Sequence, residues 1–178
     1  MGSSATFHRI SADNFNIIQQ APGGTILSYP SLAENAATCT GSHWALEFIL
    51  SSGQENKTIE LISEIFTPKK AIGEEEFNVL PPEQKWEMYE RGDYIPYLDP
   101  VIISKFSNLL DNMSENDIKS KYDAKELNDN EIYPKVWHND NSADHSFNER
   151  HIVEDFLELK GIFKAADKEK NYILVYIG

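Results

Sequence analysis

The chain has 178 residues, and its 29 acidic side chains outnumber its 16 basic ones, giving a formal net charge of −13 at pH 7. A surface this negative repels phosphate groups, which argues against nucleic acids and anionic membranes as partners. A basic protein or a cation is the natural complement, although acidity can also serve solubility alone. The length fits a single domain over residues 1–178, and a hydrophobic fraction of 40% is enough for a packed core.

Cysteine usage and the N-terminal segment bear on the compartment. Cys39 is the single cysteine, so no intrachain disulfide can form, which fits a reducing compartment. The N-terminal segment has no basic region followed by a long apolar run, and no apolar run reaches membrane-spanning length. We therefore expect a cytoplasmic protein without a signal peptide or a membrane span.

The first elements of the chain are marked by alternation and by turn residues. Alternating residues predict a strand at 5–10, and Ser11 is placed to cap a short helix that has Ile17 among its apolar residues. The APGG segment at 21–24 predicts a turn. Residues 25–30 predict a short strand or an extended connection.

The segment GSHWALEFILSSG predicts a buried helix, because it is apolar almost all round. Ser42 is its expected N-cap, and Gly53 is its C-terminal stop. A second helix is expected over 58–67, ending before Pro68.

The middle of the chain has weaker signals. Residues 71–77 predict a strand with a bulge near Gly73. Residues 79–99 are rich in proline and aromatic side chains, and they predict an ordered connection with a turn of helix around Trp86.

Caps mark the helices of the second half. The expected starts are Asp99–Pro100, Ser114–Asp117, Asp123 and Ser146–Glu149. The last helix is expected to reach about Asp167, with Leu157 widening its apolar stripe. Residues 171–178 predict a closing strand that is apolar on both faces and therefore central. The fold class is thus α+β, a small sheet that includes the N- and C-terminal strands and packs against several helices.

The segment from 130 to 151 is rich in histidine and aspartate. Its candidate metal ligands are His138, Asp140, Asp144 and His145. Neither the spacing of a helical zinc site nor the glycine of a calcium loop is present, and Asn, Ser and Asp also favour turns. A solvated loop is the favoured interpretation, and we expect no resident metal or cofactor.

Several aromatic side chains with polar tips are candidates for ligand or protein contact. The candidate binding residues are Trp44, Glu47, Tyr94, Tyr97, Tyr133 and Trp137. Pro134 restrains Tyr133 to an extended backbone, so this segment is expected to lie ordered across the protein. Packing in the core is the alternative role for these aromatic rings.

Two places in the chain are candidates for catalytic residues. Glu47 sits in an apolar run, where a carboxylate must be paired or protonated, so it is the best single candidate for a catalytic acid or base. An exposed position on one edge of the helix is the alternative. Cys39 and His43 are four residues apart, but Gly41 and Ser42 interrupt helical geometry between them, so a buried structural cysteine is favoured over a nucleophile.

The chain resembles the YfbM-like family of bacterial proteins, whose function is undefined. The matching positions are Tyr97, Leu98, Pro100, Ile132, Tyr133, Pro134 and Trp137, followed by a long helix and a final apolar strand. The helix bearing Trp44 and Leu46 is similar to an early buried helix of the family. Members often carry histidine at the Glu47 position. The resemblance implies a single-domain intracellular α+β protein and implies no activity.

Two functions follow as expectations. The first is a non-enzymatic acidic binding module, such as an immunity-type partner that neutralises a basic toxin, because no convergent catalytic motif is present. The alternative is a small-molecule hydrolase with a pocket built from Trp44, Glu47, Tyr133 and Trp137, in which Glu47 acts as acid or base.

Overall fold

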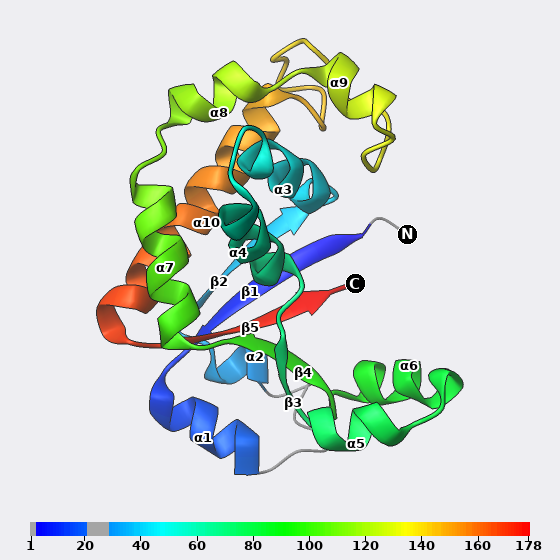
Figure 1. The fold of residues 1–178 in the computed structure, drawn as a ribbon, viewed down its shortest axis with the longest axis vertical. Helices are drawn as coiled ribbons and strands as arrows, with labels where there is room; N and C mark the ends of the chain where they lie inside the picture. Colours follow the sequence, from blue (N-terminus) through cyan, green and yellow to red (C-terminus); the bar gives the residue numbers. More distant parts are fainter. Residues whose placement is uncertain (1–2, 21–28) are drawn as a thin grey trace.

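The computed structural model describes residues 3–20 and 29–178, which form a sheet with helices on both of its faces (Figure 1). The expected turn at 21–24 and most of the segment 25–30 lie outside the described residues. Tyr29–Leu32, at the end of that segment, is a short helix. Within the described residues, no helix combines the length and the apolar character needed to cross a bilayer.

The sheet has the order β2-β1-β5-β4-β3, and its neighbouring strands are antiparallel. Its strands are β1 (Ser4–Ile10), β2 (Asn35–Thr40), β3 (Lys70–Ile72), β4 (Ile95–Leu98) and β5 (Tyr172–Ile177). The closing strand β5 lies in the middle, as its two apolar faces predicted. The edge strand β2 was not predicted, because its NAATCT sequence is short and buries only Ala37 and Cys39.

Helices cover the two faces unequally. They are α1 (Ala12–Gln20), α2 (Tyr29–Leu32), α3 (His43–Ser51), α4 (Asn56–Phe66), α5 (Glu74–Val79), α6 (Pro82–Arg91), α7 (Pro100–Asp111), α8 (Glu115–Lys121), α9 (Ala124–Asp129) and α10 (Glu149–Glu169). The main core joins the sheet to α3, α4, α7, α8 and α10. It brings together Leu46 of α3, Trp137, Phe156 of α10 and Val175 of β5, four segments distant in sequence.

A smaller core lies on the opposite face of the sheet, under α1. It is built from Ile10, Phe15, Ile18, Ile72, Ile95 and Leu174. Phe15 stacks on Tyr172 with ring centroids 3.8 Å apart, which fixes α1 against β5.

Most predicted helix starts are confirmed. Asp99 accepts hydrogen bonds from the backbone amides of Val101 and Ile102, at 2.9 and 3.0 Å, so its carboxylate caps α7. Ser114 and Asp117 form the predicted capping box of α8. The start of α10 was wrong by two residues, because the N-cap is Asn148, whose side chain accepts from the His151 amide.

The middle of the chain is where the sequence interpretation was wrong. The predicted strand at 71–77 ends at Ile72, because Gly73 adopts φ +78° and starts α5. Residues 79–99 are not mainly a connection, since they form α6 and β4. Two residues expected on apolar stripes, Ile17 and Leu157, are exposed at 55% and 46%.

Candidate functional site

A groove beside α3 gathers three of the predicted binding residues, and it encloses about 560 Å³. Its lining, which we call the α3 groove, is Trp44, Glu47, Phe48, Ser51, Glu131, Ile132 and Tyr133. The first four recur at the helical spacing i, i+3, i+4, i+7, so one whole face of α3 opens into the groove. The expected buried helix is therefore buried on one face, with Ala45, Leu46, Ile49 and Leu50, and at its first residue, His43.

The aromatic wall of the groove joins two distant segments. Trp44 and Tyr133 meet edge to face, with ring centroids 5.2 Å apart and planes at 73°. Trp44 is 39% exposed, an unusual position for a tryptophan on a helix whose other face is core. The aromatic wall is thus accessible to a ligand at its outer edge, and the side chains behind it are packed in the core.

Trp137 holds this segment in place and does not line the groove. It is buried, and its indole N–H donates to the Ile132 carbonyl at 3.0 Å. The Asn128 side chain accepts from the Trp137 amide and donates to its carbonyl, both at 3.0 Å. These bonds fix the backbone that carries Tyr133, so the pocket predicted from four residues contains three of them, with the fourth as an anchor.

The charged side chains that line the groove are both acidic. Burial raises the pKa of Glu47, and a hydrogen bond with the Ser63 hydroxyl opposes the shift. Glu131 is exposed and forms a 3.4 Å ion pair with Lys135, whose ammonium is also exposed. A pair this exposed contributes little to stability, so a ligand cation can compete with Lys135.

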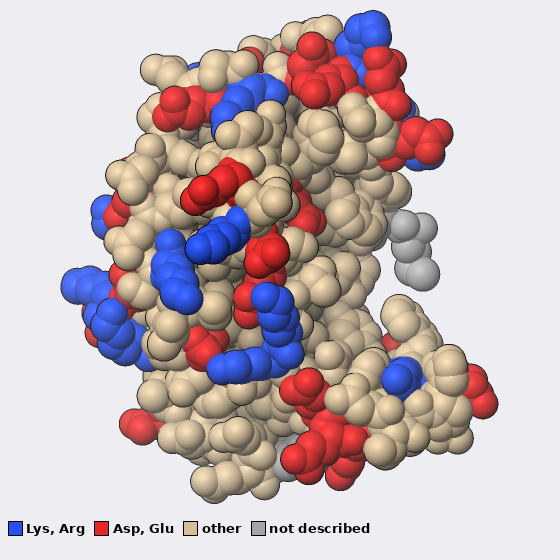
Figure 2. Space-filling model, viewed as in Figure 1, with Lys and Arg blue, Asp and Glu red and all other residues tan. Residues whose placement is uncertain are grey.

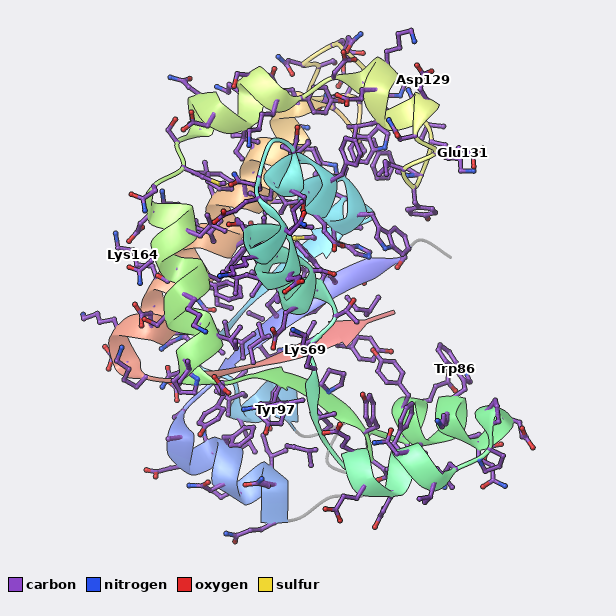
Figure 3. The ribbon with its side chains drawn as sticks, viewed as in Figure 1. Lys69, Trp86, Tyr97, Asp129, Glu131 and Lys164 are labelled. Carbon is purple, nitrogen blue, oxygen red and sulfur yellow. The ribbon has the colours of Figure 1, made fainter. Side chains whose placement is uncertain are left out.

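Tyr94 and Tyr97 lie in two other places. Tyr94 lines a second groove of about 500 Å³, together with Phe77, Trp86 and Tyr89. Tyr97 faces α1, with its ring 4.8 Å from that of Phe15, and Figure 3 shows it well away from Glu131. Tyr94 directly precedes β4 and stands three positions before Tyr97, and an odd offset along extended chain places side chains on opposite faces.

The second groove forms where the hydrogen-bonded pairing between β4 and β5 ends. The two strands pair at Tyr97–Leu174 and Leu98–Ile173, and the next residue back along β4 is Pro96, which has no N–H to donate. The Tyr89 hydroxyl takes the place of a strand partner, since it donates to the Ile177 carbonyl at 2.8 Å and accepts from its amide at 2.9 Å. Trp86 and Phe77 were missed as lining residues, although Trp86 and Tyr89 stand three apart on one face of α6.

A buried polar cluster lies between α3 and α10. The Ser42 hydroxyl donates to the Asp155 carboxylate, and His151 Nε2 lies 3.7 Å from the same oxygen. Burial raises the pKa of Asp155 to about 7, the Ser42 hydrogen bond opposes this, and the charges of Glu158 and Glu154 add to it. Sequence interpretation missed this carboxylate, whose one signal is an acidic residue inside the apolar stripe of α10.

Cys39 and His43 are both buried, which agrees with the structural role favoured for the cysteine. Burial raises the pKa of the Cys39 thiol well above its usual value, and the charges of Asp155 and Glu158 raise it further. Burial lowers the pKa of His43 to about 4. Such a thiol is a poor nucleophile, so the pair does not support covalent catalysis.

The predicted metal candidates separate into a cluster and an outlier. Among the described residues, His138, Asp140 and His145 bring one ligand atom each to within 4.8 Å of one another. Asp144 is exposed and does not belong to this group.

Comparisons with known proteins agree with this fold. The solved structure of YfbM from Escherichia coli, a protein of unknown function, superposes with a TM-score of 0.59 at 13% identity and covers 98% of this chain and 99% of that one. At this identity the likeness shows the fold alone. No curated protein matches the sequence. A family model, described as a domain of unknown function (DUF1877), matches residues 1–176, so the YfbM-like resemblance is confirmed and the chain belongs to the DUF1877 family.

Proposed function

We propose that this protein is a non-enzymatic binding module that holds a basic protein partner at the α3 groove. The observation that carries the proposal is an aromatic pair in one lining with Glu47 and Glu131: an exposed Trp44 and a partly buried Tyr133. An arginine or lysine of the partner would place its cation against the tryptophan face and between the two carboxylates. The net charge of −13 would speed the approach of such a partner.

The state of Glu47 supports this proposal. Its carboxyl group is half-buried, and the influences on its pKa are burial and the Ser63 hydroxyl, with no cation among them. A cation that enters the groove would supply the missing countercharge and favour the ionised carboxylate. A ligand cation would therefore stabilise a Glu47 carboxylate that has no countercharge in the free protein.

The distribution of charge on the surface also matters. Figure 2 shows lysine and arginine side chains gathered over α4 and α7, while acidic side chains gather over α5 and around α9. Glu131 follows α9, so the α3 groove opens at an acidic end of the molecule. A basic partner would be directed to this end. An immunity-type role in a reducing cytoplasm is part of the proposal, and the buried free thiol of Cys39 fits it.

The test is the affinity for the product of the adjacent gene, measured by isothermal titration calorimetry with purified proteins. We expect Trp44→Ala and Tyr133→Ala to weaken binding at least about tenfold, because buried aromatic anchors dominate interface energies. Added salt should weaken it further through slower association.

Trp86→Ala is the matched control, because Trp86 is an exposed tryptophan in the second groove, 60% exposed. It should leave the affinity unchanged within about twofold. Absence of binding, or a loss caused by Trp86→Ala and not by Trp44→Ala, contradicts the assignment of the interface to the α3 groove.

A small-molecule hydrolase remains the second candidate, because the half-buried Glu47 with its raised pKa faces a groove. Turnover of chromogenic esters or glycosides that Glu47→Gln abolishes would favour it. An inactive wild-type protein that still binds its basic partner would favour the binding module.

A further inference from the structure

We propose that His138, Asp140 and His145 form a binding site for a divalent transition-metal ion, with zinc as the best-matched ion. The three side chains offer two imidazole nitrogens and one carboxylate oxygen, a donor set that suits zinc and its neighbours better than magnesium or calcium. This site lies in the loop between α9 and α10, and it shares no residue with the lining of the α3 groove.

The side chains already converge. The imidazole rings of His138 and His145 have centroids 5.2 Å apart with planes inclined by 30°. Nδ1 of His145 lies 3.0 Å from each carboxylate oxygen of Asp140. In a tetrahedral zinc site with bonds of about 2.0–2.1 Å, ligand atoms stand about 3.3 Å apart. The largest separation here is within 4.8 Å, so rotations of exposed side chains close the remaining gap.

The backbone that carries the two histidines is fixed by a buried residue. The Asn148 amide group donates to the carbonyls of Ser142 and His145, at 2.9 and 3.2 Å. Its side-chain oxygen caps α10, and the His138 amide donates to the Phe147 carbonyl at 2.9 Å. Asn148 is fully buried, so the loop ends are tied to the start of a helix that belongs to the main core.

The ligand count defines what the site would do. Three protein ligands leave a further coordination position for water or for a group from another molecule. Two neutral imidazoles and one carboxylate leave a divalent ion with a net charge of +1, which the acidic surface around it favours. The bound ion would hold residues 138–145 as one closed loop at the entrance to α10.

The test uses untagged full-length protein freed of metal with a chelator, titrated with zinc chloride and separately with magnesium chloride. We expect saturable zinc binding, no magnesium binding, and a loss of at least about tenfold in zinc affinity in His138→Ala and in His145→Ala. Asp144→Ala is the matched control, since it removes an exposed carboxylate of the same loop and should change the affinity less than about twofold.

Two further readouts separate a site from adventitious binding. Cobalt(II) should give visible absorption bands in the wild-type protein that are absent in His145→Ala, and zinc should slow amide hydrogen exchange in residues 138–148. Circular dichroism will show that the variants are folded, which the exposure of these side chains leads us to expect. Zinc affinity unchanged by both histidine variants, or no saturation below about 1 mM zinc, would overturn the proposal.

Discussion

Asp155→Asn should change the way the free energy of unfolding depends on pH, because this carboxyl group is buried beside Ser42 and His151. In the folded protein the pKa of Asp155 is about 7, against 3.8 in the unfolded chain. Between these two values the folded state holds a proton that the unfolded state has released. The contribution of this group to stability is therefore largest at low pH and falls as pH rises toward 7.

The magnitude follows from the two pKa values. Their difference is about three units, and one unit corresponds to about 1.4 kcal/mol, so the total loss is about 4 kcal/mol. Roughly half of it, about 2 kcal/mol, falls between about pH 5.5 and about pH 8, a range that stays above the isoelectric point. Asp155 is only 6% exposed, so solvent screening does not reduce this figure. Asparagine has nearly the shape of aspartate and cannot ionise, so the free energy of unfolding of the variant does not include this fall with pH.

Urea denaturation of both proteins at the two pH values gives the comparison directly. We expect the stability of Asp155→Asn relative to wild type to improve by about 2 kcal/mol from about pH 5.5 to about pH 8. Glu169→Gln is the control, because Glu169 is an exposed carboxylate at the other end of α10, paired with Lys168, and should show no such change. A difference between Asp155→Asn and wild type that is the same at both pH values would refute the argument, since it would mean that Asp155 is ionised in the folded protein as in the unfolded one.

Two predictions concern the backbone. Gly73→Ala should destabilise the protein by at least about 2 kcal/mol more than Gly53→Ala. Both glycines have φ above +70°, so the backbone strain is similar in the two variants. An added Cβ at Gly73 would lie 1.9 Å from the Asp93 carbonyl oxygen, whereas an added Cβ at Gly53 would meet no atom within 4 Å. Equal losses for the two variants in urea denaturation would contradict the steric argument. Asp99→Ala should cost about 1 kcal/mol through loss of the α7 cap, and an unchanged midpoint of thermal unfolding would show that the cap contributes nothing.

Local signals in the sequence were enough to predict much of the fold. A cap such as Asp99 acts on the amides of its own helix, so the start of α7 is encoded within a few residues. The central position of β5 follows from its apolar character on both faces. Leu46 was correctly expected on a buried helix, because its segment is apolar almost all round.

Elements that depend on distant contacts were not predictable in this way. Helix α6 buries Met88 alone among its residues, so its sequence has almost no apolar stripe to detect. Strand β4 is four residues long, contains a proline, and exists because β3 and β5 lie beside it. Asn148 was passed over for Ser146, since both types cap helices and only the folded loop shows which side chain reaches the His151 amide.

The candidate site was predicted in part. Trp44, Glu47 and Tyr133 were grouped on residue type, and the structure places them in one groove. Residue type does not show which way a side chain points, so Tyr97 and Trp137 were also predicted as binding residues. In the structure Tyr97 faces α1, and Trp137 anchors the segment that carries Tyr133. Glu131 was missed because its approach to α3 depends on how the loop after α9 turns back.

Hydrogen–deuterium exchange of the protein with and without its basic partner tests the central proposal most directly. We expect the partner to slow exchange in α3 and in residues 130–135, the two segments that line the α3 groove. Slowed exchange confined to α6 and β4, with α3 unchanged, would contradict it and would move the interface to the second groove.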